Sequence, residues 1–227
     1  MKITVRTLVI ALTLALLAGL SVSTPTSADD GDQPESVVVI KQFRSSARYD
    51  GNVIEYADDY FVGGKINYSA PTIYIGDEYT KKLWVGILDF DTSTLEDHAS
   101  VIGAFLELRV LRYSTVFGDP YLLLGDIYVD MAVPYFGSSV ALEAQDFEAF
   151  PTAFAGILPP AGQSNQKLTL EVDSTVAWMI SPAQHTQFKL YFLDDNDDRY
   201  SQGIAIASGN HSMVSYRPLL TVYFYYP

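Results

Sequence analysis

The stretch KLWVGILDFDTSTLEDHASVIGAFLELRVLRYS, residues 82–114, consists of two long apolar runs joined by a polar loop. In the first run both sets of alternate residues are mostly apolar, which is typical of a central strand that is covered on both faces. In the second run Leu106, Leu108 and Val110 alternate with charged residues, the pattern of a strand with one buried face. The two runs therefore predict an antiparallel pair of core strands.

The remaining chain repeats the strand pattern at short intervals. One short helix is expected over residues 175–180, capped by Asp173 or Ser174 and ended by Pro182. Helices do not alternate with strands, and no repeat of about 20–50 residues is present. The sequence therefore predicts an all-β fold, a single antiparallel β-sandwich with one short helix. Further strands are expected at residues 37–40, 72–75, 127–131, 167–172, 187–193, 204–208 and 219–226.

Two segments show weaker patterns. Residues 45–71 contain turn formers between short aromatic runs, which indicates irregular loops and short strands. Residues 134–166 are rich in Pro, Gly and Ala and predict a long excursion over the surface. Within it, the segment around Asp146, Phe147 and Glu148 is expected to line a pocket.

The N-terminus is organised like a secretory signal peptide. Lys2 and Arg6 precede an uncharged apolar run at residues 8–20, which is too short to span a bilayer comfortably. Small residues follow, and we expect cleavage after Ala28. Residues 1–28 therefore predict a secreted protein, extracellular or at the cell surface, and an uncleaved anchor is the alternative.

Cleavage would leave an acidic flexible tail, residues 29–36, and a β-sandwich domain, residues 37–227. The mature chain would carry 12 basic and 27 acidic residues, a net charge of −15. Such a surface repels nucleic acid and anionic lipid, and suits divalent cations, cationic partners or neutral polymers. The chain has no cysteine, which excludes disulfides, a thiol nucleophile and cysteine-ligated zinc. The mature chain has no second apolar run that could hold it in a membrane, so we expect no membrane span there.

Several short segments occur in an order and spacing found in a known type of domain. They are IYIG at 73–76, WVGILDFD at 84–91 with Thr94 and Leu95, VIGAFLELRV at 101–110, LEVD at 170–173 with Val176 and Trp178, QFKL at 187–190, ASGN at 207–210 and RPLLTV at 217–222. In these segments the chain resembles DNRLRE-type, disaggregatase-related extracellular β-sandwich domains, which also occur among carbohydrate-binding modules. The resemblance covers most of the mature chain and implies a jelly-roll-like module, of a type often attached to polysaccharide-active or cell-surface proteins.

The acidic run DDNDD, residues 194–198, is the densest carboxylate group in the chain. Closely spaced oxygen ligands on a loop suit a hard cation, so we expect a structural Ca²⁺ bound by Asp194, Asn196 and Asp198. The run lacks the glycine and the bidentate glutamate of an EF-hand, so distant loops would complete the site. The alternative is a solvated acidic turn. A second candidate group consists of Asp50, Asn52, Asp58 and Asp59.

No motif predicts catalytic residues. The histidines His98, His185 and His211 lie in expected loops and outside any nucleophile or zinc motif, so we interpret them as surface residues without a fixed role. Carboxylate pairs for glycoside hydrolysis depend on a separation that sequence does not show. Candidates for such pairs include Glu107, Glu143, Asp146 and Glu148.

Aromatic residues are abundant, with 16 tyrosines. Exposed rings can stack on sugars or anchor protein interfaces, whereas most rings of a sandwich pack in its core or in cross-strand pairs. We interpret Trp84 and Trp178 as core residues. Tyrosines cluster at Tyr56, Tyr60, Tyr68 and Tyr74 and at Tyr216, Tyr223, Tyr225 and Tyr226.

These patterns favour a secreted, non-catalytic β-sandwich that binds extracellular polysaccharide or cell-surface glycan, with a structural Ca²⁺. The first alternative is a structural subunit of an extracellular filament or surface layer, in which the strand at residues 37–40 pairs with a second copy of the chain. The second alternative is a polysaccharide lyase or hydrolase.

Overall fold

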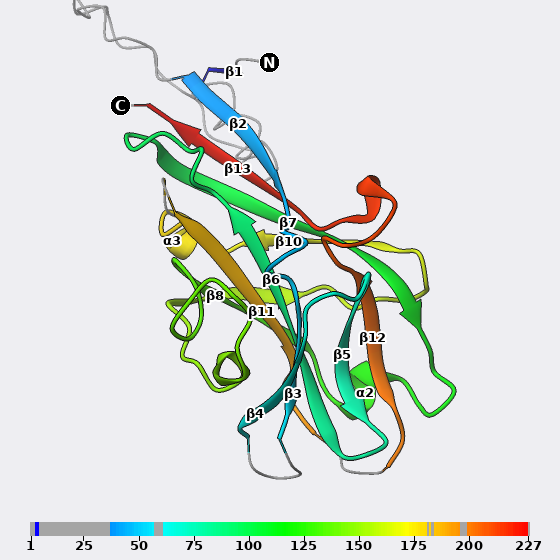
Figure 1. Ribbon diagram of the computed structural model, residues 1–227. Coiled ribbons are helices and arrows are strands. Elements are labelled where there is room, and N and C mark those ends of the chain that lie inside the picture. Colours follow the sequence, from blue (N-terminus) through cyan, green and yellow to red (C-terminus); the bar gives the residue numbers. More distant parts are fainter. Residues whose placement is uncertain are drawn as a thin grey trace, which may run out of the picture.

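The protein is an all-β antiparallel sandwich with little helix (Figure 1). The computed structural model describes residues 3–4, 37–56, 61–180, 182, 184–195 and 199–226. The strands are β1 Ile3–Thr4, β2 Val37–Arg44, β3 Gly51–Glu55, β4 Gly63–Asn67, β5 Thr72–Glu78, β6 Lys82–Asp91, β7 Ser100–Tyr113, β8 Ile127–Ala132, β9 Ala153–Leu158, β10 Lys167–Val172, β11 His185–Phe192, β12 Gln202–Ala207 and β13 Leu219–Tyr225. The helices are α2 Pro120–Leu123 and α3 Ser174–Ala177, with 3-10 turns η1 Ala144–Asp146 and η2 Val214–Tyr216.

The predicted cleavage point and the acidic tail, residues 29–36, lie outside the described residues. They therefore stay predictions. In the part of the chain that the structure describes, no helix has both the length and the apolar character needed to cross a membrane.

The strands form two layers that share β7. One layer has the order β2-β13-β7-β10. In the other layer β6 pairs with β5 at residues 82–84, with β11 at residues 86–91 and with β3 at residues 84–87. This layer continues from β5 to β12, from β11 to β8 and β9, and from β3 to β4. The first ten residues of β7 pair with β13 and β10, whereas its last residues, from Val110, pair with β12. The described strands thus form one hydrogen-bonded path that curls over the core.

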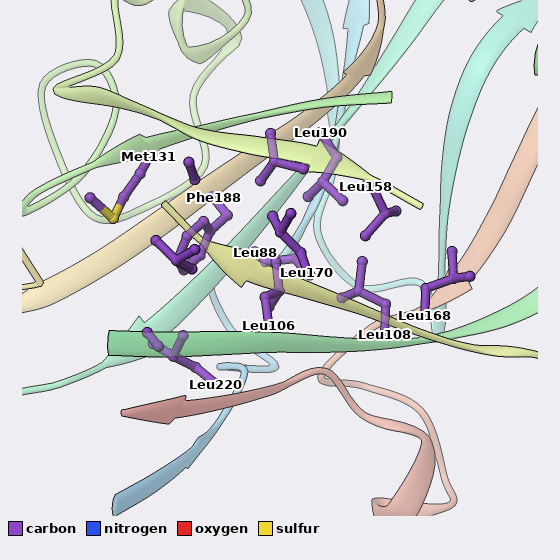
Figure 2. Packing of buried hydrophobic residues seen from close by; sticks show 14 of the residues in the cluster. Leu88, Leu106, Leu108, Met131, Leu158, Leu168, Leu170, Phe188, Leu190 and Leu220 are labelled. Atoms are coloured by element: carbon purple, nitrogen blue, oxygen red, sulfur yellow. The ribbon is translucent and has the colours of Figure 1, made fainter. Parts of the chain in front are cut away.

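The main core fills the space between the layers (Figure 2). Leu106 and Leu108 of β7 and Leu170 of β10 face Leu88 of β6 and Phe188 of β11, and all five side chains are buried. Removing one such side chain from water contributes about 1.5–3 kcal/mol. The alternation predicted for the run that became β7 is confirmed.

A second, smaller core covers the other face of β6. Leu83, Val85 and Ile87 pack beneath Phe136 and Phe147 of the excursion at residues 134–166. β6 is therefore apolar on both faces because both faces are covered, which confirms that it is a central strand.

The predicted pairing of the two runs at residues 82–114 is wrong. β6 pairs with β3, β5 and β11, whereas β7 pairs with β10, β12 and β13. The connection between them crosses from one layer to the other and buries Leu95 in the main core on the way. Alternation indicates which face of a strand is buried, but it does not identify the neighbouring strand.

The predicted helix occurs where expected and is shorter. The Asp173 carboxylate caps α3 by accepting from the backbone N–H of Thr175 at 2.8 Å. α3 ends at Ala177, and turn hydrogen bonds of the 3-10 type continue to Ile180. Several elements were not predicted. They include α2, which follows the Asp119 cap, and β9, which lies in the segment at residues 134–166, together with β1 and the 3-10 turns η1 and η2.

Candidate functional site

Strand β12 has large residues on one face and small residues on the other. Ile204 and Ile206 point into the main core, whereas Gly203, Ala205 and Ala207 lie on the outer face. β12 lies between β5 and β7. The outer face of β12 is therefore a shallow depression between β5 and β7, which carry larger side chains.

The strand register places Tyr74, Ala205 and Arg112 in one row across β5, β12 and β7. Because the methyl group of Ala205 is small, the guanidinium of Arg112 reaches over the Tyr74 ring, 5.6 Å from the ring centroid. A cation–π contact at an exposed site contributes about 0.5–1 kcal/mol. Burial raises the pKa of Tyr74 to about 12, so its hydroxyl stays protonated and donates to the carbonyl of Asp77.

Trp84 of β6 lies next to this row. Its indole meets the Tyr74 ring edge to face, with the centroids 5.6 Å apart, and its partner in β5 is Gly76. The Nε1 atom of Trp84 is buried and has no hydrogen-bond partner among the described residues. An indole N–H can only donate, so this donor is one of the few buried polar atoms that the described residues leave unsatisfied.

The close approach of β5 and β12 depends on a pair of facing glycines. Gly76 has φ +140° and Gly203 has φ +152°, a backbone conformation that favours glycine. A Cβ on either residue would lie 2.1 Å from a carbonyl oxygen of the opposite strand. Glycine is therefore required at both positions for the strands to meet at this distance.

Tyr74, Trp84, Arg112 and Ala205 line an open cavity of about 470 Å³, which we call the β12 groove. Two aromatic rings, one cation, one carboxylate and two hydroxyls converge on it. Ring faces can pack on the C–H faces of a sugar while the polar groups bond its hydroxyls. The lining residues of the β12 groove are Thr72, Tyr74, Glu78, Trp84, Leu111, Arg112, Ser201 and Ala205.

The prediction that both tryptophans are core residues is wrong. Trp84 is half-buried in the β12 groove, and Trp178 is 63 % exposed, with its Nε1 donating to the carbonyl of Thr175 at 2.8 Å. β6 is apolar on both faces, so its sequence does not reveal which of its rings reaches the surface. The alternation of small residues with Ile204 and Ile206 in β12 was the available signal for a groove.

His185 has a fixed role, contrary to the prediction, and it lies in a strand and not in a loop. It begins β11, and its Nδ1 lies 3.0 Å from Oδ2 of Asp89 in β6. Asp89 is fully buried and also accepts from Nε2 of Gln187. Burial raises the pKa of Asp89 to about 6, while the charge of His185 opposes that rise.

Asp50 extends this buried acidic cluster. One carboxylate oxygen accepts from the backbone N–H of Asp89 and the other from that of Gly209, both at 2.8 Å. Burial raises the pKa of Asp50 to about 7. The cluster therefore joins the β2–β3 loop, β6 and the β12–β13 loop.

The second calcium candidate is not supported by these contacts. Asp50 is bound to backbone donors, and the buried amide of Asn52 donates to the carbonyls of Tyr74 and Val85. Both side chains hold strands together. The other two members, Asp58 and Asp59, lie outside the described residues.

The first calcium candidate is described only in part. Asp194 is exposed after β11, and its backbone N–H donates to the carbonyl of Leu124 at 3.0 Å. Asn196 and Asp198 lie outside the described residues. Across the described ranges, no group of three or more His, Asp or Glu side chains is arranged to hold a metal ion. Calcium binding at this run stays a prediction.

The carboxylates considered for catalysis each have a partner in the fold. Glu107 forms an ion pair with Lys167, and Glu143 and Asp146 form a capping box around η1. Glu148 accepts from the backbone N–H of Gly63 at 3.0 Å.

The remaining two histidines lie in loops, as expected. His98 occupies a turn, and the ring of His211 stacks on that of Tyr216 with the centroids 5.2 Å apart.

The expected pocket-lining segment is confirmed. Phe147 and Glu148 line a second cavity of about 370 Å³ beside β8 and β11, whereas Asp146 is buried outside its lining.

No protein-family model matches the chain, and no curated protein matches it. Its function is therefore inferred from the fold and from the geometry of its surface sites.

Proposed function

We propose that this protein is a secreted, non-catalytic β-sandwich module that binds extracellular polysaccharide or cell-surface glycan in the β12 groove. The observation that carries the proposal is the grouping of Trp84, Tyr74 and Arg112 around the small residues of β12. The signal-peptide pattern at residues 1–28 supports export. The resemblance to DNRLRE-type domains points to the same class of ligand.

The lining matches the chemistry of a sugar. A pyranose ring offers apolar C–H faces and a rim of hydroxyls, each of which both donates and accepts. Trp84 and Tyr74 supply apolar rings, Arg112 supplies donors, and Glu78 supplies an acceptor. A few hydrogen bonds at about 0.5–1.5 kcal/mol each, less the cost of ordering the ligand, favour weak binding.

The direct test is affinity electrophoresis of residues 29–227 in gels that contain neutral or acidic polysaccharides. Trp84→Ala should weaken retention at least about tenfold, because it removes the largest ring of the groove. Arg112→Gln should weaken it roughly threefold to tenfold, and most strongly on acidic polymers.

Trp178→Ala is the matched control, because it removes an exposed tryptophan outside the groove and should leave retention unchanged. Circular dichroism would verify that each variant is folded. Soluble wild-type protein that is retained by no polysaccharide of the panel would refute the proposal.

A second candidate is a filament or surface-layer subunit, and the edge of β2 favours it. One side of β2 pairs with β13 along seven residues, whereas its other side pairs only with β1, at Val37 and Val38, among the described strands. β1 belongs to the predicted signal peptide, so cleavage would remove it. An open edge offers backbone groups to a strand from a second copy.

This candidate is tested by light scattering on residues 29–227 over a range of concentrations. Ile40 of β2 is 42 % exposed, and Ile40→Lys should disrupt strand addition by placing a charge at the edge. Deleting β2 would be a poor test, because Val38 and Phe43 are buried. A wild-type protein that stays monomeric throughout would exclude the filament.

A further inference from the structure

The second cavity, which we call the β11 pocket, differs in chemistry from the β12 groove. It lies beside β8 and β11, which are neighbours in one layer (Figure 1), and it shares no lining residue with the groove. Four aromatic residues line it, namely Phe61, Phe147, Phe150 and Tyr191. Its charged lining residues are Asp130, Glu148 and Lys189.

The ammonium of Lys189 is already engaged. Its Nζ donates to the carbonyls of Ala149, Phe147 and Asp146 at 2.7, 3.1 and 3.3 Å, and it lies over the Phe136 ring, 4.7 Å from the centroid. Three carbonyl dipoles and a ring face compensate its charge. Lys189 therefore anchors the wall of the pocket and has no free N–H to offer an anion.

The two carboxylates leave the lining with excess negative charge. Asp130 lies opposite Lys189 in the β8–β11 register and is buried, and burial raises the pKa of Asp130 while Lys189 opposes that rise. Glu148 is exposed at the rim. Two carboxylates therefore face one ammonium, on a protein whose net charge is −13.

We propose that the β11 pocket binds an organic ammonium group. The negative faces of aromatic rings attract a cation within about 6 Å of the centroid, and Glu148 adds an opposite charge at the rim. Phe150 is 93 % exposed, so its ring is free to close over a bound cation. An anion would meet two carboxylates, and a neutral apolar ligand would gain nothing from them.

The test uses two probes of one shape, choline and its neutral carbon isostere 3,3-dimethyl-1-butanol, in NMR titrations of the ¹⁵N-labelled chain. Choline should shift the amide signals of β8, β11 and residues 144–150. The isostere should bind roughly fivefold or more weakly, because a cation–π contribution of about 1 kcal/mol corresponds to that ratio.

Phe150 and Glu148 are exposed, and Gln at position 148 keeps an oxygen that can accept from the backbone N–H of Gly63. Phe150→Ala and Glu148→Gln should each weaken choline binding roughly threefold to tenfold. Phe117→Ala is the matched control, since Phe117 is 51 % exposed and lies outside the pocket, and it should change nothing. Equal affinity for the two probes, shifts located elsewhere, or insensitivity to both pocket variants would each overturn the proposal.

Discussion

Ala205 shows how one small residue can create a surface site. It lies between Tyr74 and Arg112 in a row across three strands, and any larger side chain there would separate the guanidinium from the ring. The three residues are far apart in sequence, and only the order and register of the strands bring them together. Sequence patterns therefore predicted the strands and not the groove.

The buried acidic cluster predicts how stability depends on pH. Asp50 has a pKa of about 7 in the folded protein against an ordinary value of 3.8, and the pKa of Asp89 is about 6. The folded state therefore binds protons more tightly than the unfolded state between these values. The stabilisation is complete below about pH 4 and is lost as the pH rises through 7.

We expect the Tm to fall by roughly 5–10 °C between pH 5 and pH 8 in calorimetry. Asp50→Asn should flatten this dependence, because an amide does not ionise. It should also lower the Tm at every pH, because the amide oxygen can accept from only one of the two backbone N–H groups that Asp50 binds. Asp97→Asn, at an exposed carboxylate, is the control and should preserve it. A Tm that rises over this range, or an unchanged slope in Asp50→Asn, would contradict the role of the cluster.

At the scale of elements, alternation identified strands reliably where one face is buried. The runs that became β7, β10 and β12 show large apolar residues at every second position, and each lies where the sequence predicts a strand. β9 was missed because Gly156 has φ +142° and the register shifts beside its partner Val129, which weakens the alternation. Partner choice was also missed, because β6 and β7 face each other across the core without pairing.

The glycine pair of β5 and β12 yields a prediction for these strands. Gly203→Ala should lower the free energy of unfolding by roughly 3 kcal/mol or more, since the new Cβ would lie 2.1 Å from the carbonyl of Ile75. Gly103→Ala in β7 is the matched control, because nothing lies within 4 Å of its added Cβ, and it should change stability by less than about 1 kcal/mol.

Urea unfolding monitored by fluorescence measures both variants. If Gly203→Ala and Gly103→Ala lowered the free energy of unfolding by similar amounts, the claim that the close approach of β5 and β12 requires glycine at position 203 would be contradicted.

At the scale of the whole molecule, the chain has no cysteine, so its core and its hydrogen bonds stabilise the fold without disulfides. Its net charge is −13. The acidic surface also predicts sensitivity to divalent cations. If Asp194 and its neighbours bind calcium, millimolar Ca²⁺ should raise the Tm by roughly 5 °C relative to chelator, and Mg²⁺ should do so much less.

Asp194→Asn should abolish the calcium effect, and Asp97→Asn, at another exposed carboxylate, should retain it. Equal Tm values with calcium and with chelator would instead identify the run as a solvated acidic turn.

Glycan binding in the β12 groove is tested most directly by filling the groove. Ala205→Leu places a large side chain between Tyr74 and Arg112 on the outer face of β12, away from the main core. In affinity electrophoresis on the polysaccharide panel, the wild-type protein should be retained by at least one polymer, and the folded variant should lose that retention. Retention of the folded variant equal to that of the wild type would contradict binding in the groove.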